Sequence, residues 1–293
     1  MIGPPSLVHR ATHQAMGTIY EVTIAGEDGP YAAEAARAVF REIDRLETLL
    51  SRFNPCSEIS RINRLMPGES LAIGIETYEC LFLGERMRAE TEGAFDINVR
   101  GGFRGESRRL PLDLIQTEGR FEAGLIAEES ASAKDLDLDL GGIAKGYALD
   151  LSLAVLADWS IENALVHGGT STAIGIGAAP DQAAGWPVGV GGGWPGADTP
   201  RRILLSGRAV SGSGIEVKGR HILDPRTGRP AEGHIAAWAS HPSGAVADAL
   251  STAFMVMSTG NVEQYCRNHP EVWALVVRDY GNCRAFGKKV NKF

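Results

Sequence analysis

Asp248 and Thr252 are the clearest pair of oxygen donors in the sequence, because they lie four residues apart in the apolar segment 244–258. If that segment is a helix, the carboxylate and the hydroxyl share one face. Hard oxygen donors of this kind are the ligands that Mg²⁺ prefers. A structural interpretation is favoured by the pattern alone: Asp248 interacts with the helix dipole, and Thr252 bonds back to a carbonyl. The spacing leaves both interpretations open.

A second candidate site lies at residues 135–150, where a strand pattern changes into a helix pattern. Asp and Leu alternate as far as residue 140, which predicts a strand with one apolar face. Gly141 and Gly142 follow, and then apolar residues at helical spacing with Lys145 in the first turn. A glycine-lined helix start with a lysine suits a phosphate or pyrophosphate. A plain strand–turn–helix connector with a surface lysine fits the pattern equally well.

His221 precedes a proline-containing turn at residues 222–230. A histidine there could take a proton near neutral pH, and Arg226 could bind phosphate oxygens in a fork. An ordinary surface turn in which Asp224 caps backbone amides is an equally good interpretation. The nearby segment 211–214, which reads Ser-Gly-Ser-Gly, predicts a bend without chemistry of its own.

The elements that must position these residues follow from hydrophobic periodicity. Apolar spacing predicts helices at 31–50, 76–92, 143–159 and 245–258, and a short helix or a turn at 57–63. Alternation predicts strands at 19–24, 164–167, 173–176 and 235–240, a hairpin of 202–205 with 208–210, and a second hairpin of 273–277 with 284–286. Residues 100–120 show no usable pattern.

Composition excludes several classes of protein. The chain has 293 residues, 44% of them hydrophobic, and a formal net charge of -7. Nucleic acid is not an expected partner, because its binding needs a basic stripe. No apolar run approaches the ~20 residues of a membrane span, and no export signal is visible. We therefore expect a cytoplasmic protein, or a periplasmic one if a signal was removed. The four cysteines form no Cys-x-x-Cys pair, which favours thiols over bridges.

Taken together, six segments resemble the motifs of the ApbE family, the FAD:protein FMN transferases, and they occur in the family's order. They are residues 15–18, 50–53 with 57–63, 93–96, 139–148, 221–228 and 247–253. The resemblance implies a single domain over residues 1–293. Its fold would be α+β, with mixed and antiparallel sheets, flanking helices and a flavin cleft between two intertwined lobes. Residues 100–120 are shorter here than is common in the family.

The activity that the resemblance implies is Mg²⁺-dependent transfer of the FMN moiety of FAD to a threonine hydroxyl of an acceptor protein, with release of AMP. FAD is then a substrate, and Mn²⁺ could replace Mg²⁺. Two alternatives use the same pocket. One is a Mg²⁺-dependent FAD pyrophosphatase, in which water replaces the threonine. The other is a non-catalytic FAD-binding protein.

The resemblance also implies roles for individual residues. Asp248 and Thr252 match the metal ligands of the family, and Gly142 matches a position that contributes its backbone carbonyl. His221 matches a histidine suspected of proton transfer, and with Asp248 it forms the expected catalytic pair. The expected flavin contacts are Met16, Phe53, Ala94, Phe95, Asp96, Asp139, Lys145 and Ile222.

Overall fold

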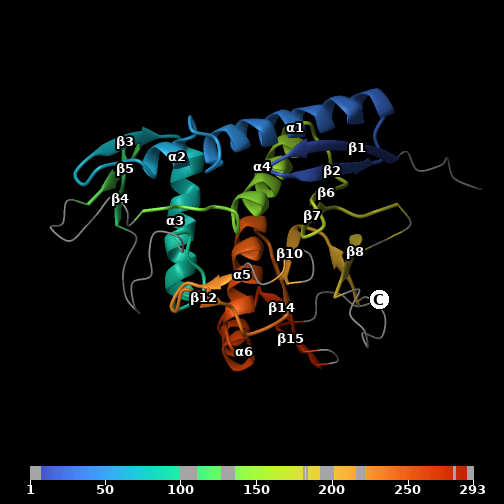
Figure 1. Cartoon of the computed structure of the whole chain (residues 1–293). Coiled ribbons are helices and arrows are strands. Elements are labelled where there is room, and N and C mark those ends of the chain that lie inside the picture. The colour runs from blue at the N-terminus through green and yellow to red at the C-terminus, as the bar shows by residue number, and fades with distance from the viewer. Residues whose placement is uncertain are drawn as a thin grey trace, which may run out of the picture.

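An eight-stranded antiparallel sheet organises the computed structural model shown in Figure 1. The structure describes residues 8–98, 111–126, 136–180, 182, 184–191, 201–215, 219, 222–279 and 282–288. In sheet order the strands are β1 (Val8–Ala15), β2 (Thr18–Ala25), β6 (Ala164–Gly168), β7 (Thr172–Ile176), β10 (Arg208–Gly214), β13 (Ala236–His241), β14 (Trp273–Asp279) and β15 (Asn282–Phe286).

Three smaller sheets accompany the central one. They are β3 (Ser70–Ile73), β5 (Arg120–Leu125) and β4 (Leu112–Thr117); β8 (Trp186–Val190) with β9 (Arg201–Leu205); and β11 (Leu223–Asp224) with β12 (Arg229–Pro230). All strand pairs among the described residues are antiparallel. Together with the helices, they confirm the predicted α+β class with antiparallel sheets.

Six helices lie among the described residues, and the four longest agree with the predicted positions. They are α1 (Gly29–Leu50), α2 (Glu58–Ile62), α3 (Ile75–Glu90), α4 (Ala144–Asp158), α5 (Gly244–Val256) and α6 (Thr259–Asn268). Helix α1 begins at the Asp28 cap, with Pro30 in its first turn, and buries one apolar stripe along its length. Figure 1 shows α1 along the top, α3 at the side, and α4 leading down to α5 in the middle.

The first turns of α4 and α5 meet at a pair of glycines. A Cβ on Gly146 would overlap the carbonyl oxygen of Gly244, and a Cβ on Gly244 would lie 2.6 Å from the Gly146 oxygen. Only glycine permits backbones to approach this closely. The Asp150 carboxylate of α4 strengthens the contact by accepting hydrogen bonds from the Ser243 hydroxyl at 2.7 Å and the Gly244 N–H at 2.5 Å. The start of α5 is therefore fixed against the start of α4.

The strand predicted at residues 135–140 is wrong in its pairing. Its described part, 136–140, has the expected alternation of burial, but among the described residues no strand pairs with it. Its backbone is bound instead by two side-chain amides and by the Ile97 carbonyl, which accepts from the Asp139 N–H at 2.7 Å. The Leu138 N–H donates to Asn63 Oδ1 at 2.8 Å, and the Asp137 N–H donates to Asn98 Oδ1 at 2.8 Å. The alternation of Asp and Leu predicts one buried face and one exposed face, but it does not predict which part of the chain binds the backbone.

Two other predictions around residue 208 are also wrong. β9 and β10 do not form the predicted hairpin, because β9 pairs with β8 and β10 pairs with β7 and β13. The segment 211–214 is not a bend but the second half of β10. A local turn signal cannot show that the chain passes from one sheet to another between two strands. The hairpin of β14 with β15 is confirmed.

Composition led to two expectations, one about membrane-spanning segments and one about the cysteines. Among the described residues, no helix combines the length and apolar character needed to cross a membrane. Cys80 and Cys266 are buried thiols, as expected, whereas Cys56 is exposed.

Candidate active site

The Asp248 carboxylate is the centre of the candidate site. Its helix, α5, is almost entirely buried, and Asp248 itself is only 3% exposed. A buried carboxylate needs hydrogen bonds and a neighbouring cation to offset its lost hydration. Asp248 has both: Ser211 Oγ donates to Oδ1 at 2.8 Å, the Gly146 N–H donates to Oδ2 at 3.2 Å, and Lys145 Nζ lies 3.4 Å from Oδ2. The carboxylate thus lies at the positive end of α4.

The predicted metal ligands meet at this place. A Cβ on Gly142 would lie 3.3 Å from Thr252 Oγ1 and 3.1 Å from the Phe95 ring. The turn that begins α4 therefore packs directly on the α5 face that carries Thr252 and Asp248. The helical spacing puts both residues beside the first turn of α4, and the Thr252 hydroxyl also bonds back to the Asp248 carbonyl at 3.4 Å, as the structural interpretation expects.

The donor atoms fit a hard divalent cation. Asp248 supplies a carboxylate, Thr252 a hydroxyl and Gly142 a backbone carbonyl, all of them oxygen donors that Mg²⁺ accepts. The Lys145 ammonium already lies between the Asp248 carboxylate and the Gly141 carbonyl, at 3.4 Å and 3.1 Å. This position therefore favours positive charge. Among the described residues, no group of three or more His, Cys, Asp or Glu side chains is placed to hold a metal ion. A metal here would depend on one carboxylate, neutral oxygens and substrate phosphates, which is common for Mg²⁺.

The turn before α4 is held by a second carboxylate. Asp139 Oδ1 accepts from the Gly141 N–H at 2.9 Å, and Arg52 Nη1 donates to Asp139 Oδ2 at 3.3 Å. Arg52 also donates to Asp137 at 3.1 Å. Arg52 therefore connects the loop after α1 to the segment that leads into the glycine turn. Arg52 belongs to the segment 50–53 that was noted in the sequence, but its residue type alone did not suggest this role.

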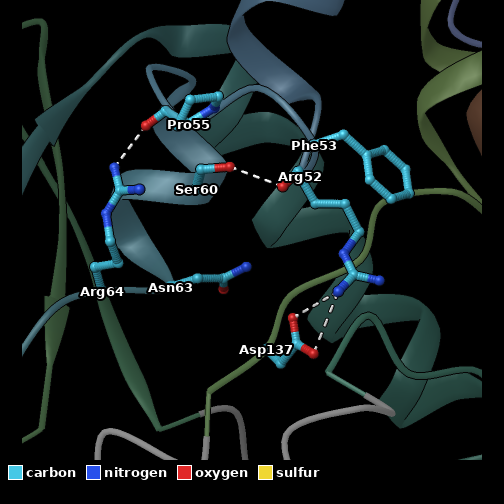
Figure 2. A pocket seen from close by; sticks show the side chains of 7 residues that line it. All are labelled: Arg52, Phe53, Pro55, Ser60, Asn63, Arg64 and Asp137. Carbon is cyan, nitrogen blue, oxygen red and sulfur yellow. Dashed lines mark hydrogen bonds and ion pairs between the residues drawn. The ribbon is translucent and has the colours of Figure 1, made fainter.

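Figure 2 shows a pocket that Arg52 lines. The Arg52 side chain points down to the Asp137 carboxylate, while the Phe53 ring projects beside it. Phe53 is 86% exposed, and the Arg52 guanidinium carbon lies 5.4 Å from the ring centroid. The pocket is lined by Arg52, Phe53, Pro55, Ser60, Asn63, Arg64 and Asp137. An exposed aromatic ring beside a cationic wall suits a planar, negatively charged ligand.

The other expected flavin contacts lie in ordered turns. Met16 adopts a positive φ of 49°, and its sulfur accepts a hydrogen bond from the Tyr20 hydroxyl at 3.2 Å. Ala94 and Phe95 are buried, and burial raises the pKa of Asp96 above its ordinary value. The Ile222 carbonyl accepts from the Ala231 N–H at 2.8 Å.

The structure brings some expected residues together and leaves others apart. Gly142, Phe95 and Thr252 are in contact, Asp248 is bound to Lys145, and Asp139 holds the same turn. Phe53 joins this group only through Arg52. Met16 and Ile222 pack against the same hydrophobic core as Phe95. His221 lies outside the described residues, so its predicted role in proton transfer stays a prediction.

Sequence reasoning missed two hydroxyl residues, Ser211 on β10 and Thr172 on β7. The register places them opposite each other, and both lie next to Asp248. One signal could have found Ser211. Ala209, Ser211 and Ser213 alternate with other residues, which puts both serines on one face of a strand.

Comparison with known proteins follows the same segments. Residues 16–276 match the ApbE family. The chain is 28% identical over 284 residues to the FAD:protein FMN transferase of Vibrio cholerae serotype O1, covering 87% of this chain and 82% of that protein. It is 25% identical over 283 residues to the FAD:protein FMN transferase of Salmonella typhimurium, covering 87% and 80%. The crystal structure of the Pseudomonas stutzeri flavinyl transferase ApbE in its apo form superposes with a TM-score of 0.78 at 26% identity, covering 98% of this chain and 96% of that one.

Proposed function

The chain belongs to the ApbE family, and from that premise we propose that it transfers the FMN moiety of FAD to a threonine hydroxyl of an acceptor protein, releasing AMP. We propose Mg²⁺ as the metal. One observation carries the proposal: Asp248, Thr252 and Gly142 meet at the mouth of α4 beside Lys145. Such a site can neutralise a pyrophosphate, which is the chemical demand of this reaction.

The proposed reaction exchanges one oxygen for another on the phosphorus of the FMN half. The acceptor threonine oxygen attacks the phosphorus of the FMN half, the bond to the AMP oxygen breaks, and the threonine proton passes to a base. His221 is the residue that we propose as this base, because an imidazole titrates near neutral pH. AMP leaves with the charge that develops on its oxygen.

The residues around α4 would hold the substrate phosphates. Asp248, Thr252 and the Gly142 carbonyl would bind Mg²⁺, which supplies charge neutralisation at the pyrophosphate when bound. Lys145 and the N-terminal end of α4 add positive charge on the same side. Arg52 and Phe53 would position the planar part of FAD against the pocket of Figure 2. Positioning and charge neutralisation supply most of the catalysis in phosphoryl transfer.

The test uses the full chain, FAD and an acceptor domain with its threonine, or with that threonine replaced by alanine. We expect AMP release and a flavin-labelled acceptor, detected by chromatography and mass spectrometry, only with Mg²⁺ and only on the threonine form. EDTA and Asp248→Asn should each abolish both signals. FMN and AMP formed equally without acceptor would instead show the pyrophosphatase. No AMP under any metal condition would leave a binding protein and refute the proposal.

A further inference from the structure

Two hydroxyls are buried side by side in the central sheet, next to the candidate site. Ser211 and Thr172 are register partners on β10 and β7, and they are 0% and 2% exposed. Their hydroxyl oxygens are 3.0 Å apart. Burying a hydroxyl costs free energy unless it is hydrogen-bonded. A pair of hydroxyls inside an apolar sheet therefore needs a partner that uses them.

That partner is Asp248, and its charge sets the direction of the hydrogen bonds. An ionised carboxylate only accepts. Ser211 must therefore donate its single proton to Asp248 Oδ1, at 2.8 Å. Ser211 then accepts from Thr172, whose hydroxyl also lies 3.5 Å from the same carboxylate oxygen. The result is a short chain of donors that runs from β7 through β10 and ends on one oxygen of Asp248.

The two carboxylate oxygens consequently have different surroundings. Oδ1 faces the sheet hydroxyls, whereas Oδ2 faces the Gly146 N–H and the Lys145 ammonium at the mouth of α4. Rotation of the carboxylate about its terminal bond would break contacts on both sides. Side chains that orient a metal-binding carboxylate commonly contribute to metal affinity without touching the metal.

We propose that Ser211 is a positioning residue for metal binding, supported by Thr172: it fixes Oδ1 of Asp248 so that Oδ2 faces the divalent cation. This inference rests on the proposed function, because it takes Asp248 as a metal ligand. A serine that only satisfied a buried carboxylate would affect the stability of the fold. A positioning serine also affects metal binding, so its removal should weaken metal binding even when the protein stays folded.

The first measurement is Mn²⁺ binding to the full chain, followed by the electron paramagnetic resonance signal of free Mn²⁺, without FAD or acceptor. Ser211→Ala should weaken Mn²⁺ binding roughly 10- to 100-fold. The matched control is Ser152→Ala. Ser152 is also 0% exposed and lies on α4, but its hydroxyl donates only to the Ala148 carbonyl. The control should change Mn²⁺ affinity by less than about twofold, since a serine at that position contributes no contact to Asp248.

The second measurement tests whether Thr172 acts through Ser211. Thr172→Val keeps the shape of the side chain and should weaken Mn²⁺ binding roughly 2- to 10-fold. The double variant should lose less Mn²⁺ affinity than the two single losses combined, because most of the Thr172 contribution passes through Ser211 and only its long 3.5 Å contact with Asp248 Oδ1 remains in Ser211→Ala. In turnover, Ser211→Ala should raise the KM for Mg²⁺ and change kcat at saturating Mg²⁺ much less. If Ser211→Ala does not fold, Thr172→Val carries the test.

The outcomes separate this inference from the function on which it rests. Wild-type binding of Mn²⁺ that is lost in Asp248→Asn but unchanged in Ser211→Ala and Thr172→Val would overturn the positioning role and leave the transferase intact. Additive losses in the double variant would overturn the relay from Thr172. A wild-type protein that neither binds Mn²⁺ nor releases AMP would refute the proposed function itself.

Discussion

Replacing Gly146 with alanine tests whether the contact between α4 and α5 holds the candidate site together. An added Cβ would overlap the carbonyl oxygen of Gly244 and lie 2.7 Å from the Ala245 nitrogen. Both are backbone atoms, so no side-chain rotation can relieve the overlap. The two helices must move apart by roughly 1 Å to restore ordinary contact distances. That movement draws the Gly146 N–H and Lys145 away from Asp248.

Two effects of opposite sign set the magnitude. Alanine is a better helix former than glycine by about 1 kcal/mol. Overpacking a tight contact costs about 1–3 kcal/mol, and a backbone obstacle places this contact at the upper end. The clash therefore wins, and we expect Gly146→Ala to lower the free energy of unfolding by about 2 kcal/mol. We also expect weaker Mn²⁺ binding, because Oδ2 of Asp248 loses two of its neighbours.

The matched control is Gly260→Ala in α6, where the added Cβ would have only the Ser258 hydroxyl oxygen near it outside the helix backbone, at 4.0 Å. This variant has only the favourable effect and should be unchanged or stabilised by up to about 1 kcal/mol. Urea unfolding of both variants, with Mn²⁺ titration of each, makes the comparison. A Gly146→Ala protein as stable as the Gly260→Ala protein, with wild-type Mn²⁺ affinity, would refute the reasoning.

Two further predictions follow from the site and the core. Lys145→Met keeps most of the side-chain stem but removes the charge, so FAD affinity measured by flavin fluorescence in EDTA should fall at least about tenfold; equal affinity would show that Lys145 does not bind the phosphates. Burial lowers the pKa of His234, whose Nδ1 and Nε2 lie 2.6 Å from the Phe254 carbonyl oxygen and 2.9 Å from the Thr259 hydroxyl. The unfolded state, with a His pKa of about 6.5, therefore binds more protons, and the free energy of unfolding should fall as the pH drops below about 6.5. Urea unfolding between pH 7.5 and 5.5 checks this, and a slope that His234→Gln leaves unchanged would assign the effect elsewhere.

Hydrophobic spacing predicted the long helix α1, because that helix has one apolar face to bury. In α1 the stripe from Ala32 to Leu50 is buried as expected. The prediction of α5 succeeded for a different reason: almost every residue is apolar, and the helix is buried all round. An aspartate inside such a helix is unusual, because burying a carboxylate costs free energy, but Asp248 became a candidate through its four-residue spacing from Thr252.

The partners of these elements could not be predicted from local patterns. Residues 136–140 alternate like a strand, yet Asn63 and Asn98, distant in sequence, bind their backbone. Ser211 looked like part of a bend because serine and glycine are common in turns. The role of Ser211 depends on which strand pairs with β10 and on which helix packs against that strand. A short stretch of sequence contains neither piece of information.

A shared pattern in α4 and α5 explains how two buried carboxylates are stabilised at once. Each helix has a glycine in its first turns and an aspartate four residues later: Gly146 with Asp150, and Gly244 with Asp248. The close glycine contact lets each aspartate reach the N-terminus of the other helix, since Asp150 accepts from the Gly244 N–H and Asp248 from the Gly146 N–H. Asp150 also accepts from the Ala245 N–H and the Ser243 hydroxyl, so it has three donors. Asp248 instead faces the Lys145 ammonium and the sheet hydroxyls, and it is the more deeply buried of the two carboxylates, at 3% exposed. The same local device therefore produces a helix cap at Asp150 and a buried carboxylate beside a lysine at Asp248, and the difference lies in Lys145 and the hydroxyls of the sheet.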